Sequence, residues 1–130
     1  MQWTSAEGMA FTPADAEPWL PFSDPLTTVE SQMDDPTSML SLYRALLELR
    51  HEACELMLGA ITMLAPDDAD VLAYERHVAG ASTLVAINFS DEPRPFEFPR
   101  IVHQVLSTHT PRSEPFTVAT LGPNEAVIAR

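Results

Sequence analysis

The sequence has no lysine, a single cysteine and only four glycines among its 130 residues. All seven basic residues are arginine, and 19 acidic residues bring the formal net charge to −12. Nucleic acids and anionic membrane surfaces are bound through a basic face, so both classes of partner are disfavoured. Cys54 has no cysteine with which to form an internal disulfide or a thiolate metal site. So few glycines also leave no phosphate-binding or dinucleotide-binding loop.

Long apolar runs are missing as well. No stretch approaches the ~20 apolar residues that a membrane helix needs. Residues 1–7 lack the basic start and the apolar run of a signal peptide, so we expect a cytoplasmic protein. Hydrophobic residues nevertheless make up 45% of the chain, which predicts a folded core.

Residues 1–35 are acidic and rich in proline, and they show no apolar periodicity. The prolines remove backbone donors and disfavour helix at the preceding residue, which predicts an irregular arm. This arm also carries four large aromatic residues, which are costly to leave in water. We therefore expect the arm to lie against another surface. The aromatic residues are Trp3, Phe11, Trp19 and Phe22.

Residues 36–58 are predicted to form one long helix. Asp35 is a suitable N-cap, Pro36 suits the first helical position and Gly59 is a plausible stop. Apolar residues recur at helical spacing between Met39 and Leu49 and cover more than one stripe, which indicates burial on two sides.

Residues 59–130 show short apolar runs separated by turn compositions, which is typical of an antiparallel sandwich or barrel. The expected fold is mainly β: an antiparallel β-sandwich of about seven strands, preceded by the long helix and the irregular arm. The expected strands are Ala60–Leu64, Val71–His77, Thr83–Phe89, Arg94–Phe98, Ile101–Thr108, Phe116–Leu121 and Ala126–Ala129. The core is expected to include Leu72, Tyr74, Val85, Ile87, Phe89, Val105, Val127 and Ile128.

The residues of a catalytic or metal site are not evident in the sequence. The carboxylate pairs all fall at a cap or in turns, where turn chemistry accounts for them. These groups are Asp34 with Asp35, Asp67 with Asp68 and Asp70, and Asp91 with Glu92. The four histidines show no metal-ligand spacing. We therefore assign no catalytic, cofactor-binding or metal-binding residue.

Several motifs, taken in order, resemble one enzyme family. Residues 1–4 (Met-Gln-Trp-Thr), 10–12 (Ala-Phe-Thr) and 18–21 (Pro-Trp-Leu-Pro) are similar to a stretch of the α-glucosidases of the α-amylase superfamily. Residues 35–51, from Asp-Pro-Thr-Ser-Met-Leu to Leu-Glu-Leu-Arg-His, look like the last helix of that family's catalytic (β/α)₈ barrel. Isomaltase-type and trehalose-type glucosidases are the nearest in kind.

The later motifs resemble the C-terminal β-sandwich of the same family. They are Val71-Leu72-Ala73-Tyr74-Glu75-Arg76, Leu84-Val85-Ala86-Ile87-Asn88-Phe89-Ser90 and the closing Leu121-Gly122-Pro123-Asn124-Glu125-Ala126. Thr4, Ala10 and Glu52 depart from the family pattern. The resemblance implies that the family's three catalytic carboxylates lie on barrel strands preceding these motifs, so no catalytic role is carried over.

The resemblance implies a non-catalytic accessory role, in which this segment stabilises a catalytic barrel. The expected partners are that barrel, or a second copy of the chain bound through the helix and the arm, with α-glucosides as possible ligands. A stand-alone carbohydrate-binding or protein-interaction module is the alternative. The expected docking interface consists of Trp3, Phe11, Trp19, Leu40, Tyr43 and Leu47.

Overall fold

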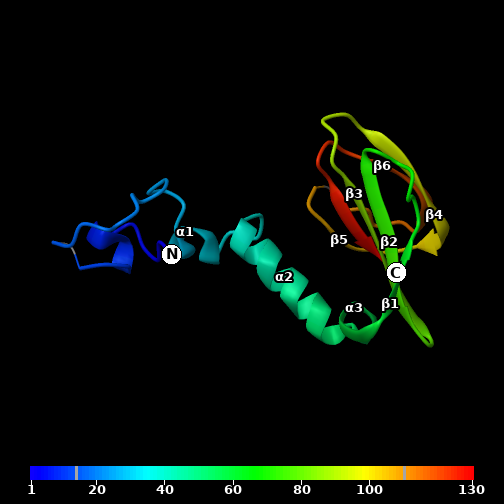
Figure 1. Ribbon diagram of the computed structural model, residues 1–130, viewed down its shortest axis with the longest axis horizontal. Helices are drawn as coiled ribbons and strands as arrows, with labels where there is room; N and C mark the ends of the chain where they lie inside the picture. The colour runs from blue at the N-terminus through cyan, green and yellow to red at the C-terminus, as the bar shows by residue number, and fades with distance from the viewer. Residues whose placement is uncertain (14, 110) are drawn as a thin grey trace. The chain divides into compact units, whose positions relative to one another are not determined.

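The computed structural model describes residues 1–13, 15–109 and 111–130. The chain divides into an N-terminal unit, Met1–Leu49, and a C-terminal unit, Arg50–Arg130. Figure 1 labels the helices α1 to α3 and the strands that follow them.

The N-terminal unit contains more helix than its prolines predict. A short 3-10 helix, η1, spans Glu7–Ala10, and an α-helix, α1, spans Val29–Met33. Backbone bonds tie the first residues to the start of α1, because Val29 N–H donates to the Gln2 carbonyl at 3.0 Å and Glu30 N–H to the Trp3 carbonyl at 2.9 Å. The arm is thus looped back on itself, with α1 as its last element.

The next helix, α2, spans Met39–Glu52 and begins three residues later than the expected start at Pro36. Asp35 caps a turn instead, since its Oδ1 accepts the Thr37 N–H at 2.8 Å. The helix is capped by Ser38, whose Oγ accepts the Ser41 N–H at 3.2 Å.

The expected single helix is interrupted at Ala53. This residue has φ −102° and ψ 98°, an extended conformation, and a separate helix α3 follows over Cys54–Leu58. Ala53 is only 3% exposed, so its small side chain is packed at the break. Gly59 follows α3, as expected, and leads into the first strand.

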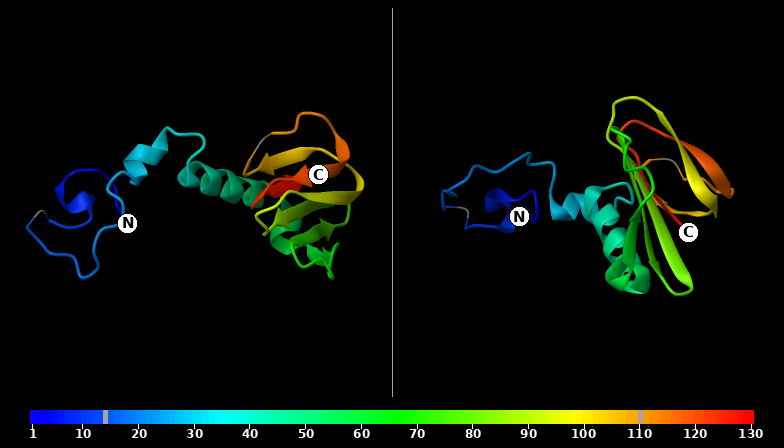
Figure 2. Two further views of the ribbon diagram at one scale, coloured as in Figure 1. Left: turned by 90° about the horizontal axis from the view of Figure 1, so that it is seen from above. Right: turned by 45° about the vertical axis from the view of Figure 1, so that its right-hand side comes forward.

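The described residues of the C-terminal unit form seven strands in two antiparallel sheets, which confirms the expected β-sandwich. The larger sheet has the order β1-β2-β3-β7-β5, and the smaller pairs β4 with β6. Figure 2 shows the two sheets as separate layers. The strands are β1 (Ala60–Met63), β2 (Val71–Val78), β3 (Ala81–Asn88), β4 (Arg94–Val102), β5 (Gln104–Ser107), β6 (Phe116–Leu121) and β7 (Ala126–Ala129).

The core between the sheets uses the opposite face of β3 from the one expected. Leu84 and Ala86 are fully buried in it, whereas Ile87 is only half-buried. The predictions for Phe89 and Val105 were wrong, because these side chains are 64% and 43% exposed. The core consists of Val71, Ala73, Leu84, Ala86, Phe96, Phe98, Val102, Ala119, Leu121, Val127 and Ala129.

The other expected core residues are distributed unevenly. Val127 is completely buried in the core, as predicted. Val85 and Ile128 are buried, 6% and 8% exposed, but they oppose each other on the outward face of the large sheet. Leu72 and Tyr74 share that face by strand register and are half-buried. The physical reason is that both faces of β3 are apolar, so alternation alone does not identify the inner one.

Candidate docking surface

The N-terminal unit contains a cleft of about 670 Å³, and Gln2 is one of the residues that line it. The Gln2 side chain bridges to the loop opposite: its Nε2 donates to the Asp24 carbonyl at 2.9 Å, and its Oε1 accepts the Ser23 N–H at 2.7 Å. One amide thereby fixes the distance between the first residues and the loop before α1.

The start of α1 lines this cleft and contains a capping box. Thr28 Oγ1 accepts the Ser31 N–H at 3.1 Å, and Ser31 Oγ accepts the Thr28 N–H at 3.0 Å. Thr28 is only 2% exposed, so its hydroxyl is satisfied inside the unit. A Thr-x-x-Ser sequence is a weaker signal than the usual Thr-x-x-Glu, so the sequence alone did not indicate this cap.

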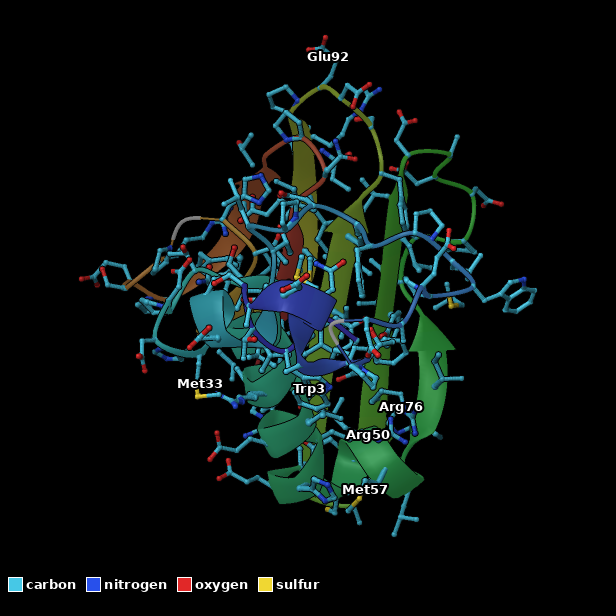
Figure 3. All side chains as sticks on the ribbon, turned by 90° about the vertical axis from the view of Figure 1, so that its left-hand side faces the viewer. Trp3, Met33, Arg50, Met57, Arg76 and Glu92 are labelled. Carbon is cyan, nitrogen blue, oxygen red and sulfur yellow. The ribbon has the colours of Figure 1, made fainter. Side chains whose placement is uncertain are left out.

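The cleft brings together three of the six expected docking residues. Phe11, Leu40 and Tyr43 line it, together with Leu20, Gln2 and Gln32. Trp3 instead lines a smaller cleft of about 390 Å³ beside Val29 and Met33. Trp19 and Leu47 line neither of these two clefts. Figure 3 labels Trp3 and Met33.

Five of the six docking residues are exposed. The side chain of Trp19 is 96% exposed, that of Tyr43 60% and that of Leu47 55%. Phe11 and Trp3 are 57% and 49% exposed, and Leu40 is half-buried. Leu40, Tyr43 and Leu47 are spaced three and four residues apart on α2, so they lie on one stripe of that helix. We call these six residues the docking surface.

The surroundings of this surface are acidic. Residues 1–35 carry seven carboxylates and no basic residue, and all seven are exposed: Glu7, Asp15, Glu17, Asp24, Glu30, Asp34 and Asp35. Hydrogen bonds from the Thr37 side chain and backbone lower the pKa of Asp35. The docking residues are therefore aromatic or aliphatic, and the segment that carries three of them is negatively charged.

No cluster of three or more histidine, cysteine or acidic side chains suited to a metal occurs in residues 1–13, 15–109 and 111–130. The carboxylates of the expected turns serve those turns: Asp68 Oδ1 accepts the Asp70 and Val71 N–H groups, each at 2.9 Å. Asp91 Oδ1 instead accepts a bond from Asn124 Nδ2 at 3.1 Å, which connects its turn to the turn before β7.

Two carboxylates that the sequence did not single out are buried in the C-terminal unit. Glu125 is held by Arg112, whose Nη1 and Nη2 donate to its two oxygens at 2.7 and 2.9 Å. Ser107 Oγ and the Gly122 N–H donate to the same carboxylate, each at 2.7 Å. Burial raises the pKa of Glu125, but these donors outweigh it and lower the pKa to about 2.

The second buried carboxylate, Glu55, lies at the start of α3. Its Oε1 accepts the Thr83 hydroxyl at 2.6 Å and lies 3.3 Å from the Arg130 guanidinium. The Thr83 hydrogen bond lowers the pKa of Glu55, despite burial. The donors around both buried carboxylates thus favour the ionised form, and each carboxylate joins separate parts of the fold.

No helix in the described part of the chain is long and apolar enough to cross a membrane.

Comparison with known proteins identifies the family. Residues 61–128 match a family described as "Domain of unknown function (DUF3459)". The chain is 36% identical over 102 residues to the probable oligo-1,6-glucosidase 2 of Bacillus subtilis. This match covers 77% of this chain and 18% of that protein. The chain is 32% identical over 114 residues to the trehalose synthase of Thermus thermophilus, and this match covers 82% of this chain and 12% of that protein.

Solved structures agree with the sequence comparison. The trehalulose synthase MutB from Pseudomonas mesoacidophila MX-45 superposes with a TM-score of 0.87 at 29% identity, over 98% of this chain and 24% of that one. This chain therefore spans less than a fifth of the two curated relatives, 18% and 12%, and about a quarter of the crystallised enzyme, 24%. The chain belongs to the DUF3459 family and resembles the C-terminal part of α-glucosidase-type enzymes of the α-amylase superfamily.

Proposed function

We propose that this chain is a non-catalytic accessory domain that docks onto the catalytic barrel of an α-glucosidase-type enzyme and stabilises it. The docking surface makes the contact, and the β-sandwich is the rigid body that carries no chemistry of its own.

The exposure of the docking surface carries this proposal. Trp19, Tyr43 and Leu47 are 96%, 60% and 55% exposed, although aromatic and leucine side chains favour burial. Contiguous apolar surface of more than a few hundred Å² on a soluble protein is a mark of an interaction site. A partner that covers these side chains removes apolar area from water, at roughly 25 cal/mol per Å².

The charge around this surface defines the partner's chemistry. Seven exposed carboxylates without a basic residue in residues 1–35 repel an acidic partner and favour one with a cationic rim. We therefore propose an apolar patch bordered by arginine or lysine on the barrel.

The absence of catalysis is part of the proposal. Retaining hydrolysis of a glycoside needs two carboxyl groups about 5 Å apart across the scissile bond. The two buried carboxylates do not supply them, because Glu125 and Glu55 each form an ion pair with an arginine of the fold. The resemblance to the α-glucosidases supports this proposal, because it implies that the family's catalytic carboxylates precede the matched region. We expect the purified chain not to hydrolyse maltose, isomaltose or an aryl α-glucoside.

A truncated relative tests the docking. The B. subtilis oligo-1,6-glucosidase 2, shortened to end before the region that this chain matches, is mixed with the chain, and binding, melting temperature and hydrolysis are measured. We expect a complex with a higher melting temperature than the shortened enzyme alone. Tyr43→Glu, which places a charge on the docking surface, should weaken the complex by about tenfold or more.

Val118→Glu is the matched control, because Val118 is 58% exposed but lies on β6 of the sandwich. Equal binding by Tyr43→Glu and Val118→Glu would contradict docking through this surface. A turnover that co-purifies with the chain and disappears with a single carboxylate substitution would contradict the non-catalytic role.

A sugar-binding module remains the second candidate, and the exposure of Trp19 favours it. An indole that is 96% exposed is free to stack on a pyranose ring. Titration of the chain with maltose and isomaltose, followed by tryptophan fluorescence, tests this function. A saturable change that Trp19→Ala abolishes would support sugar binding over docking.

We also propose that, without a barrel, two chains pair through the docking surface. High salt should strengthen this pairing, because it screens the carboxylates of residues 1–35. Light scattering of the parent and of Tyr43→Glu across salt concentrations tests it, and a parent that stays monomeric would contradict it.

A further inference from the structure

The edge of the large sheet at β1 has unpaired backbone groups and no protecting charge. In residues 1–13, 15–109 and 111–130, no strand pairs with the far side of β1, which ends the sheet order. All four β1 residues are exposed. Natural sheets usually protect such an edge with lysine, proline or a bulge, and Ala60-Ile61-Thr62-Met63 has none of these. In Figure 3, β1 is the short green strand that follows α3 at the margin of the sheet.

The register identifies which backbone groups are free. Leu64 N–H donates to the Ala73 carbonyl at 2.9 Å, and Leu64 lies directly opposite Ala73 because Met63 is paired with Tyr74, so Leu64 is at a hydrogen-bonded position of the ladder. Bonded and non-bonded pairs alternate in antiparallel sheets, so Thr62 and Ala60 also bond to β2. The N–H and C=O groups of Ile61 and Met63 therefore point to the free edge. The outward carbonyl of Gly59 is already occupied, since Arg76 Nη2 donates to it at 2.8 Å.

These free groups are self-complementary. If a second copy of β1 lies antiparallel with the two-fold axis at Thr62, Ile61 of one chain opposes Met63 of the other. Each such pair exchanges two hydrogen bonds, and symmetry gives about four in all. The exposed side chains of Ile61 and Met63, 59% and 44% exposed, then lie side by side on the same face.

Charge favours a second copy at this edge. Residues 56–66 contain no charged side chain, so the pairing brings no like charges into direct opposition. Two chains that each carry a net charge of −12 repel each other overall, which favours contact through an uncharged segment. Leu58, 81% exposed, and Met57, 42% exposed, extend the apolar surface next to β1.

We propose that β1 is a homodimerisation edge, where two chains pair antiparallel through the backbone of Ile61 and Met63 and join their five-stranded sheets. The contact is short, so the association is weak and belongs to the low end of specific interfaces. It uses none of the six docking residues, which all lie between Trp3 and Leu47 in the sequence.

The test uses the full chain carrying Tyr43→Glu, which removes association through the docking surface. Sedimentation is measured in high salt from ~10 μM to ~1 mM protein, a range suited to a weak dimer. Met63→Pro removes an outward N–H while leaving the bonds to β2, because proline is tolerated at the solvent side of an edge strand. We expect it to weaken the dimer by roughly tenfold or more, since two symmetry-related donors are lost.

Ile61→Lys should abolish the dimer by placing a charge on the edge, and Val118→Lys, with the same charge change on an exposed valine of β6, should leave it intact. Amide hydrogen exchange gives a readout that does not depend on variants. The Ile61 and Met63 amides should exchange more slowly at high than at low protein concentration.

A monomer over the whole range would overturn the proposal. So would a dimer that both β1 variants leave intact, or Ile61 and Met63 amides whose exchange does not depend on concentration. If a variant does not fold, as seen by circular dichroism, the amide exchange of the parent decides. Loss of docking on a barrel with the β1 dimer intact would contradict the proposed function alone.

Discussion

The carboxylate of Glu125 and the guanidinium of Arg112 form a two-pronged ion pair, with nitrogen–oxygen distances of 2.7 and 2.9 Å. The Glu125 side chain is only 3% exposed and that of Arg112 23%. Arg112 Nη2 also donates to the Thr120 carbonyl at 2.9 Å, so the guanidinium connects the loop before β6, the strand itself and the turn before β7. Bidentate, shielded pairs of this kind are stronger than surface pairs.

Removing the cation from this pair should be strongly destabilising. Arg112→Met leaves a buried carboxylate without its principal donor, and we expect a loss of about 3 kcal/mol or more in the free energy of unfolding. Urea denaturation followed by circular dichroism measures it. The control is Arg94→Met, whose pair with Asp70 is 43% and 39% exposed and should contribute less than about 1 kcal/mol. Equal losses for the two variants would contradict the interpretation.

The same carboxylate should make stability depend on acid. Its folded-state pKa is about 2, below the ordinary value of 4.5, so the stabilisation is complete above pH 4.5 and is lost as the pH falls towards 2. This difference in pKa corresponds to about 3 kcal/mol. Unfolding free energies of the parent and Glu125→Gln should converge as the pH drops through this window. If both decline in parallel, the Glu125 pKa does not cause the dependence.

Much of the C-terminal unit could be predicted from its sequence. Turn residues at regular spacing gave seven strands, and two of them, Phe116–Leu121 and Ala126–Ala129, have the predicted bounds. The turn residues and the alternation along β3 did not predict which face of this strand packs against the other sheet. Asn88 shares the buried face, and it is accommodated because its Nδ2 donates to the Glu92 and Gly122 carbonyls, each at 2.8 Å. Those partners come from loops that sequence alternation does not describe.

The helical region shows a similar limit. The apolar spacing over residues 36–58 continues across Ala53, where the backbone turns to an extended conformation. Alanine favours helix, so local propensity gives no signal for the break. The buried Glu55 and its bond to Thr83 in β3 supply the reason, since α3 must present its first turn to the sheet. The docking residues were chosen from the sequence, and their role stays a prediction.

The corrected core makes its own prediction. Leu84 is completely buried between the sheets, whereas Phe89 is 64% exposed. Leu84→Ala should cost about 2–5 kcal/mol through lost burial and a residual cavity. Phe89→Ala removes a larger side chain but should cost less than about 1 kcal/mol, because little of its area is buried. Thermal or urea unfolding of the two variants distinguishes the faces, and the reverse order would restore the original core assignment.

Gly59, between α3 and β1, should not tolerate a side chain. Its φ of −66° suits any residue, so alanine would stabilise by restricting the unfolded chain if space allowed. A Cβ there would lie 2.3 Å from the Glu55 carbonyl oxygen and 2.9 Å from that of His77, and backbone atoms move only at a cost. We therefore expect Gly59→Ala to destabilise the chain by about 1–3 kcal/mol. Gly122→Ala is the matched control, since its Cβ would meet no atom closer than 3.6 Å, and it should stay near the parent in urea unfolding. A Gly59→Ala chain as stable as Gly122→Ala would mean that α3 and β2 do not approach Gly59 as closely as the structure shows.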